Sequence, residues 1–318
     1  MMMACVLCTI TVNFLSLSHV RINKRVSNVP TRLPLNRNNV LTMNFLKMIA
    51  GAGMGILAMI VVSGCTNNAT SGKDSANAVA GKPVPGTPIK IDSSKRYIYL
   101  TWDDSPQPPG TVNCRSVFRS GGVKATFFSV GFNKVGPWKT RLIDSIRNDY
   151  PQFLLANHSF SHGFRDKYKK FYAPDMTDSA LNDFLRNEKE LNIPVKIIRL
   201  PGNNTWVSNG DIQGQKVNTA LVKKLDSLGY KIIGWDLEWG QQSKAKAPKE
   251  SVNEMIQRIN RRFDDGNTHH PNAIVILSHD RLFEKQQYVD SLRRFISILK
   301  ADKRNVFETI DHYPAVQK

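Results

Sequence analysis

Two histidines four residues apart, His158 and His162, follow a short apolar run in the stretch "LLANHSFSH". The chain has seven histidines, so this spacing alone also fits an ordinary polar surface loop. Two imidazoles and one carboxylate, with positions left open for water and substrate, form a catalytic zinc site. A metal site therefore requires a carboxylate from another part of the chain.

Further side chains that could do chemistry lie at or just after the ends of other apolar runs. They are Asp103 and Asp104, Arg199, Asp236 and Glu238, and His279. One of the two neighbouring aspartates can bind the metal, and the other can act as a general base toward water. His279 can protonate a leaving nitrogen. Arg199 can keep the base ionised, because a nearby positive charge lowers the pKa of a carboxylate.

The apolar runs that end at or near these side chains have the length and composition of buried strands. They cover residues 97–103, 124–130, 153–157, 196–200, 231–236 and 273–278. Segments with helical periodicity lie at residues 179–191, 218–229, 251–263 and 288–300. This alternation predicts an α/β fold with a buried parallel sheet, and six or seven such units fit a barrel better than an open sheet. No glycine-rich phosphate loop follows the first strand, which excludes a nucleotide-binding domain.

A parallel barrel would bring the side chains at the strand ends together. The carboxyl-terminal ends of all strands in such a barrel meet on one face, and that face carries the active site. Residues far apart in sequence would thus converge on one pocket, and we interpret His158 and His162 as metal ligands on this ground. Taken singly, each motif would still fit a turn, a helix cap or an ion pair.

Six motifs occur in a fixed order between residues 97 and 281, namely "YLTWDDSP", "KATFFSVG", "NHSFSH", "RLPG", "WDLEW" and "ILSHD". In this order they resemble the polysaccharide deacetylases, the NodB-homology domain of carbohydrate esterase family 4. The resemblance implies a distorted parallel (β/α)7-type barrel in a single catalytic domain. It also implies metal-dependent removal of acetyl groups from N-acetylated sugar polymers, with one divalent metal, expected to be Zn2+.

The resemblance also implies a role for each candidate residue. Asp103 matches the catalytic base, Asp104 matches the metal-binding aspartate, and the histidine pair matches the two metal histidines. Arg199 matches the arginine that steadies the base, and His279 matches the catalytic acid. The candidates for substrate or oxyanion binding are Pro201, Gly202, Trp206, Trp235 and Trp239.

Three positions depart from the family pattern. Ser105 replaces the usual glycine after the paired aspartates. Gly202 stands where an aromatic residue commonly lies, which removes one pocket wall unless Trp206 fills the space. Gln241 occupies the place of the aspartate that usually orients the acid histidine. Two other carboxylates are candidates for that orienting role, Asp236 and Glu238.

The amino-terminal part of the chain has the features of an export signal. Residues 43–65, "MNFLKMIAGAGMGILAMIVVSGC", combine a basic start, an apolar run and small residues before Cys65. This pattern resembles a bacterial lipobox, in which the cysteine is lipidated and begins the mature chain. A plain transmembrane anchor is the alternative, but the run is short for a membrane span.

These features divide the chain into three parts. We expect residues 1–64 to be a leader whose true start is Met43, and residues 65–94 to be a flexible tether rich in Asn, Ser, Gly, Ala and Pro. Residues 95–318 are then the deacetylase domain. Cys114 is the only cysteine after Cys65, so this exported domain has no internal disulfide.

The charge of the chain indicates the kind of partner. The leader holds six basic residues and no acidic ones, so the formal net charge falls from +18 for the whole chain to +12 for the mature chain. A basic exported protein suits an anionic surface such as a cell-wall polymer or lipid headgroups. We expect a monomeric lipoprotein of the bacterial cell envelope, anchored in a membrane, with a polysaccharide substrate and no nucleic-acid partner.

The sequence therefore predicts a metal-dependent N-deacetylase of an amino-sugar polymer. Peptidoglycan, a chitin-like polymer and an exopolysaccharide with N-acetylglucosamine units all remain open as the substrate. One alternative is a non-catalytic glycan-binding relative, which would not need the complete set of base, ligands and acid. Another is a glycosidase with two carboxylates, which would not need the three histidines and would not respond to a chelator.

Overall fold

The computed structural model describes residues 83–242 and 245–317. The expected leader, Cys65 and residues 65–82 of the expected tether lie outside the described residues. Within the described ranges, no helix is both long and apolar enough to cross a bilayer. Residues 83–94 contact the domain, since the Gly86 N–H donates to the Asp311 carboxylate at 2.9 Å and the Ile89 N–H donates to the Gln317 side chain at 2.6 Å.

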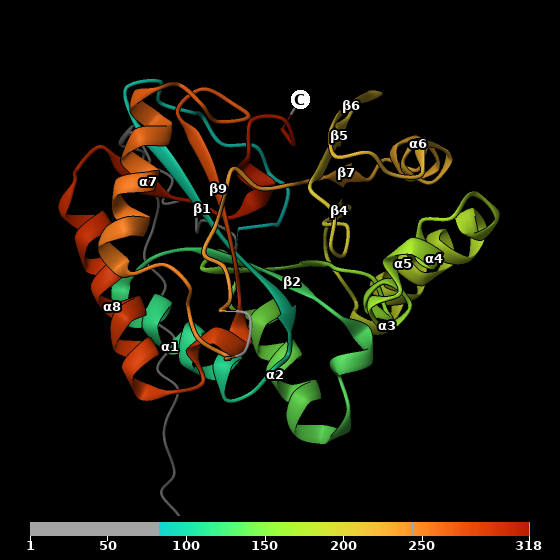
Figure 1. Cartoon of the computed structure of the whole chain (residues 1–318), viewed down its shortest axis with the longest axis horizontal. Helices are drawn as coiled ribbons and strands as arrows, with labels where there is room; N and C mark the ends of the chain where they lie inside the picture. Colours follow the sequence, from blue (N-terminus) through green and yellow to red (C-terminus); the bar gives the residue numbers. More distant parts are fainter. Residues whose placement is uncertain (1–82, 243–244, 318) are drawn as a thin grey trace, which may run out of the picture. The chain divides into compact units, whose positions relative to one another are not determined.

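Ten strands form one curled sheet in the part of the chain that the structure describes (Figure 1). Their spatial order is β6-β5-β7-β4-β3-β2-β1-β9-β8, and β10 pairs with β1 beside this path. The bounds of the strands are Arg96–Ser105 (β1), Ala125–Ser129 (β2), Phe153–Asn157 (β3), Ile197–Ile198 (β4), Thr205–Ser208 (β5), Asp211–Gly214 (β6), Lys231–Ile232 (β7), Leu237–Glu238 (β8), Ala273–His279 (β9) and Asn305–Phe307 (β10).

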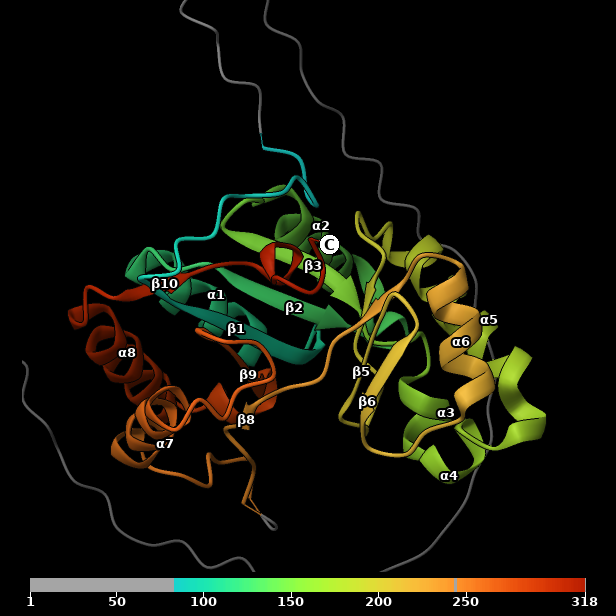
Figure 2. The ribbon, with the colours of Figure 1, turned by 90° about the horizontal axis from the view of Figure 1, so that it is seen from above.

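Helices cover the sheet in two groups. Figure 1 shows α1, α7 and α8 beside β1 and β9, and α5 and α6 beside β4 and β7, while Figure 2 shows the curled strands between these groups. The helix bounds are Gly110–Gly121 (α1), Gly136–Asn148 (α2), His162–Asp166 (α3), Tyr168–Phe171 (α4), Thr177–Leu191 (α5), Thr219–Ser227 (α6), Val252–Asp264 (α7) and Gln286–Ala301 (α8). Short 3-10 helices cover Gly131–Asn133 (η1), Pro174–Met176 (η2), Asp280–Phe283 (η3) and Ile310–His312 (η4).

The sheet and its helices confirm the predicted α/β fold of distorted barrel type in one domain. The six predicted strands correspond to β1, β2, β3, β4, β7 and β9, and the four predicted helices correspond to α5, α6, α7 and α8. The predicted parallel sheet is mixed at one edge, because β5 pairs antiparallel with both β6 and β7. The strands that carry the candidate site, β1, β2, β3, β4 and β9, pair in parallel as expected.

The antiparallel hairpin has a local cause that the sequence contains. Asn209 and Gly210 link β5 to β6 and have positive φ values of 53° and 85°. A two-residue turn with positive φ at both positions matches the twist of antiparallel strands, and Asn-Gly is its preferred sequence. The dipeptide therefore predicts a hairpin at a place where the pattern of apolar runs gave no strand.

Alternation along β1 places apolar side chains on both faces of the sheet. Ile98, Leu100 and Trp102 belong to a core cluster with residues of α1, α7 and α8. Tyr97 and Tyr99 belong to a second cluster on the inner face of the curl. Because side chains alternate in a strand, Asp103 continues the inner row. Burying a large apolar side chain contributes about 1.5–3 kcal/mol, and these rows fix the register that aims Asp103 inward.

Candidate active site

The strand ends bring the predicted residues together through their register. Asp103 of β1 lies directly beside His279 of β9 in the parallel pairing. Asn157 of β3 pairs with Ile198 of β4, so the next residues, His158 and Arg199, also leave neighbouring strands together. Parallel strands end on the same edge, which is why four motifs that are distant in sequence share one site.

A bulge in β1 turns both aspartates toward this site. Alternation alone would send Asp103 and Asp104 to opposite faces of the sheet. The pairing of β1 with β2 shifts between Asp103 and Ser105, and Asp104 has a φ of 71° in the left-handed region. A bulge of this kind re-aims a side chain next to a functional site. The Ser105 hydroxyl then donates to the Asp280 carboxylate at 2.7 Å, which holds the end of the strand.

Asp104, His158 and His162 form the one group in the described residues that could hold a metal ion. Nε2 of His162 lies 3.1 Å from Oδ1 of Asp104, and Nε2 of His158 lies 3.7 Å from the same oxygen. This Oδ1 is buried and forms no hydrogen bond. Two nitrogens and a carboxylate oxygen pointing at one spot fit a divalent metal such as zinc, so the donor set suits the predicted ion.

Both histidines are held through their other ring nitrogen. Nδ1 of His158 lies 2.9 Å from the backbone oxygen of Arg199, and Nδ1 of His162 lies 2.6 Å from Oδ1 of Asp166. A partner on Nδ1 fixes the ring and leaves Nε2 for the metal. These partners come from the neighbouring strand end and from the turn after His162.

The surroundings shift the pKa values of the two candidate metal histidines in opposite directions. Burial and the nearby His162 lower the pKa of His158 to about 3, so its ring is neutral. Burial lowers the pKa of His162, but Asp104 and Asp166 outweigh it and raise the pKa to about 9. Burial would raise the pKa of Asp104, but the neighbouring histidines lower it far below its usual range. Because a metal ion binds the neutral form of an imidazole, a metal at this site would compete with a proton for His162.

Arg199 holds the second aspartate. Its side chain is fully buried, and Nη1 lies 3.0 Å from Oδ1 of Asp103 and 2.7 Å from the Thr101 hydroxyl. The remaining guanidinium nitrogens donate to the backbone oxygens of Ile233 and Gly234. Burial raises the pKa of Asp103, and the charge of Arg199 opposes the rise. Asp103 is thus a fixed carboxylate with a strengthened tendency to take up a proton.

His279 lies beside Asp103 in the pairing of β1 with β9. Its Nδ1 is buried and makes no hydrogen bond within the described residues. Burial lowers the pKa of His279, whereas Asp104 and Asp103 oppose the change. Gln241, which stands in the place of the usual orienting aspartate, accepts a hydrogen bond from Nε of Arg281 at 2.8 Å instead.

The structure distinguishes Glu238 from Asp236, the two carboxylates that were candidates for orienting His279. Glu238 lines the same cavity as His279, and the charge of Asp103 adds to burial in raising the pKa of Glu238. The carboxylate of Asp236 instead accepts the backbone N–H groups of His269 and Val275 at 2.6 and 2.7 Å. Asp236 thereby holds two backbone segments together, and it does not line the cavity.

Only some of the candidate substrate-binding residues line the cavity. Gly202 and Trp235 line the cavity with His279. Pro201 does not line this cavity, and its backbone oxygen accepts a hydrogen bond from the Tyr172 hydroxyl. Trp239 is buried in the core against Phe283 and Phe295. Its apolar surroundings explain why it is not available to a substrate.

Trp206 does not fill the space beside Gly202. Its ring stacks on His269, with 4.0 Å between the ring centroids, and tilts against Tyr313. The nearby pocket wall comes from Tyr168, whose ring occupies the space that a Cβ at Gly202 would enter. Tyr168 follows the histidine motif in the sequence, so spacing from "RLPG" gave no signal for it.

Two cavities meet at the site. The inner cavity, of about 250 Å³, contains Asp103, His158, Gly202, Trp235, Glu238 and His279. The outer cavity, of about 590 Å³, contains Asp104, Phe132, Asn133, Arg165 and Gln241. His162, Tyr168 and Arg281 line both. Arg281, which no motif of the sequence indicated, forms an ion pair with Asp104.

The chain is similar in sequence to known proteins. Residues 90–204 match the model of the family described as polysaccharide deacetylase. A peptidoglycan-N-acetylglucosamine deacetylase of Bacillus cereus is 24% identical over 216 residues, which cover 66% of this chain and 85% of that protein. The chain is thus similar in sequence to polysaccharide deacetylases over these residues.

Solved structures support the same fold. The structure of a CE4 esterase of Streptococcus mutans has 25% sequence identity and a TM-score of 0.51, with 68% of this chain and 86% of that chain covered. The catalytic domain of a peptidoglycan N-acetylglucosamine deacetylase of Eubacterium rectale has 23% identity and a TM-score of 0.50, with 70% and 92% covered. The curled sheet described above is thus similar in fold to these two proteins.

Proposed function

We propose that this protein is a metal-dependent hydrolase that removes N-acetyl groups from a polymer containing N-acetylglucosamine. One observation carries the proposal: two nitrogens and a carboxylate oxygen converge at one spot, with a second buried carboxylate 3.5 Å from Nε2 of His158. A glycan-binding protein has no need of a buried base beside a ligand set. The relative from Bacillus cereus, named as a peptidoglycan-N-acetylglucosamine deacetylase, favours peptidoglycan as the polymer.

The chain's own residues have separate tasks in this reaction. Asp104, His158 and His162 would hold the divalent metal, which when bound polarises an amide oxygen and lowers the pKa of water. Asp103 accepts the proton of the attacking water, and its fixed ion pair with Arg199 keeps it oriented. His279, beside Asp103 on the neighbouring strand, gives a proton to the leaving amine. Burial of these groups strengthens their electrostatic interactions.

Acetate release tests the proposal directly. We expect the purified protein to release acetate from polymeric or oligomeric N-acetylglucosamine, to lose this activity with a chelator, and to regain it when zinc is added. Peptidoglycan, chitin oligosaccharides and an N-acetylglucosamine exopolysaccharide serve as parallel substrates. Release of reducing ends without acetate would identify a glycosidase, and binding without either product would identify a glycan-binding protein.

We also propose that the mature chain is held at a membrane of the cell envelope through lipid on Cys65. The small residues before this cysteine support the proposal. Replacing Cys65 with Ala is expected to release the protein from membranes or to leave an unprocessed precursor. Fractionation and mass spectrometry measure both results. Unchanged processing and membrane association of this variant would favour a plain apolar anchor instead.

A further inference from the structure

The turn after the second histidine has an unusual backbone. His162, Gly163, Phe164, Arg165 and Asp166 all have φ between 54° and 63°, so α3 is a left-handed turn. Each non-glycine residue in this conformation costs about 1–2 kcal/mol. Only contacts with the surrounding structure can hold such a run, and strain of this kind is typical of functional sites.

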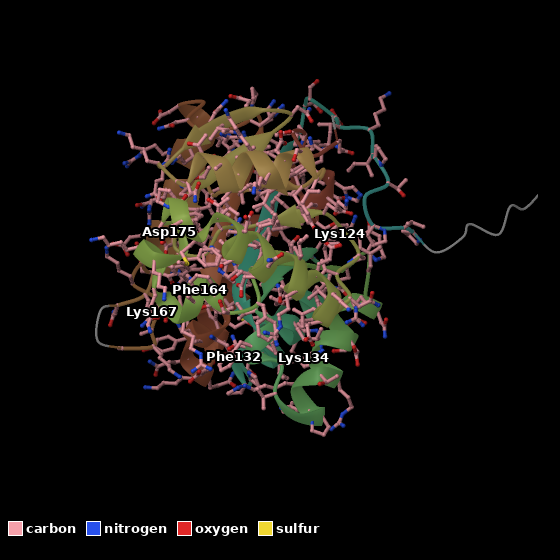
Figure 3. The ribbon with its side chains drawn as sticks, turned by 90° about the vertical axis from the view of Figure 1, so that its right-hand side faces the viewer. Lys124, Phe132, Lys134, Phe164, Lys167 and Asp175 are labelled. Atoms are coloured by element: carbon pink, nitrogen blue, oxygen red, sulfur yellow. The ribbon has the colours of Figure 1, made fainter. Side chains whose placement is uncertain are left out.

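Tyr168 is the centre of the contacts that hold this turn. Its ring lies against two glycines of separate segments, since a Cβ on Gly163 would come within 2.8 Å of the ring and a Cβ on Gly202 within 2.7 Å. Both glycines have positive φ values, 63° and 62°. The two segments thus make room for one aromatic ring between the histidine motif and the "RLPG" loop. Figure 3 looks onto this side of the domain, with Phe164 and Lys167 labelled in the same segment.

The hydroxyl of Tyr168 joins the ring to the metal ligand. It donates to Oδ1 of Asp166 at 2.9 Å, and the same oxygen lies 2.6 Å from Nδ1 of His162. The rings of Tyr168 and His162 meet edge to face, with 5.8 Å between their centroids. Asp166 therefore holds the ligand and the tyrosine in one arrangement.

Tyr168 is part of the lining of the candidate active site. The ring is partly exposed, and it lines the inner cavity with Asp103 and His279 as well as the outer cavity with Phe132 and Arg281. Flat aromatic rings supply rigid contact area for an apolar face at low entropic cost. The ring faces of pyranose sugars are such apolar faces.

We propose that Tyr168 is a substrate-binding residue whose ring forms the wall for the sugar to be deacetylated, and that Asp166 is a positioning residue that fixes Tyr168 and His162 together. This inference rests on the proposed function, because it takes an N-acetylglucosamine polymer as the substrate. The wall stands in the space that Gly202 leaves open, so the "RLPG" loop and the left-handed turn build it jointly.

Binding without turnover tests the wall. The zinc-loaded full chain carrying Asp103→Asn is titrated with a tetramer of N-acetylglucosamine by calorimetry. Adding Tyr168→Leu or Tyr168→Ala is expected to weaken tetramer binding about threefold to tenfold, the range for loss of one aromatic contact. Tyr168→Phe keeps the ring and should bind the tetramer almost as tightly as the parent.

Zinc affinity tests the positioning role without any use of activity. Competition with a chromophoric chelator should show about tenfold weaker zinc binding for Asp166→Asn, the lower end of the range for partners of metal ligands, because the Asp166 side chain is 69% exposed. Tyr168→Phe should weaken zinc binding less. Tyr230→Phe is the matched control, since it also removes a hydroxyl that donates to a carboxylate, away from both cavities.

The wall formed by Tyr168 and the positioning role of Asp166 can fail independently. Tetramer binding unchanged in both Tyr168→Leu and Tyr168→Ala would overturn the wall, and zinc binding unchanged in Asp166→Asn would overturn the positioning role. If the Asp103→Asn protein does not bind the tetramer and the unmodified protein releases no acetate, the proposed function and the wall are overturned together. Thermal denaturation of each variant identifies any loss of binding that is due to unfolding. If Tyr168→Ala unfolds, the wall is tested with Tyr168→Leu, which keeps most of the side-chain volume.

Discussion

Replacing Asp103 with Asn is expected to lower the turnover number for acetate release by about 10²–10⁴ while the metal stays bound, which is the range for loss of a general base. Asparagine keeps the size of the side chain but cannot accept a proton. Asp103 is buried and held by Arg199 at 3.0 Å, so the rest of the site should keep its shape. Turnover on an N-acetylglucosamine oligomer and metal content by elemental analysis measure the two effects.

Asp104→Asn is the matched comparison for this result. Asp104 contributes the carboxylate of the ligand set, so its replacement should weaken metal binding, and excess zinc should restore part of the rate. His279→Ala should resemble Asp103→Asn in retaining metal, and an activated acetyl ester with a good leaving group should recover much of its lost rate. The roles of the aspartates are exchanged if Asp103→Asn loses metal while Asp104→Asn keeps it.

The combined replacement of His158 and His162 with Ala is expected to abolish metal binding and to reduce acetate release by roughly 10³-fold or more. A bound metal supplies several kcal/mol of stabilisation to the transition state, and each 1.36 kcal/mol corresponds to a factor of ten. With both nitrogens removed, only one carboxylate of the ligand set remains. Elemental analysis and rate measurements in zinc-containing buffer test the result.

His269 and His270 provide the control for this double variant. His269 stacks on Trp206, and neither histidine lines the inner or the outer cavity. Their joint replacement with Ala should leave metal content unchanged, because the ligand set stays intact. Full metal content in the His158 and His162 variant would show that the ligand set is misassigned.

The sequence by itself predicted the strands and most of the residues of the site. The run 153–157 matches β3, and the run 97–103 lies within β1, because buried parallel strands are continuous apolar segments whose ends are visible as changes to polar residues. His158 and His279 directly follow such runs, and Arg199 lies near the end of another. Because parallel strands end on one face, the sequence also predicted that these residues lie together.

Only the tertiary structure decided how these residues are aimed and what surrounds them. The bulge at Asp104 depends on the register between β1 and β2, and the burial of Trp239 depends on residues of η3 and α8 that pack against it. Tyr168 fills the space beside Gly202 because a left-handed turn carries it there. Such contacts join segments that are distant in sequence, and no local period or spacing encodes them. Local patterns therefore determined which residues reach the site, and long-range packing determined their geometry.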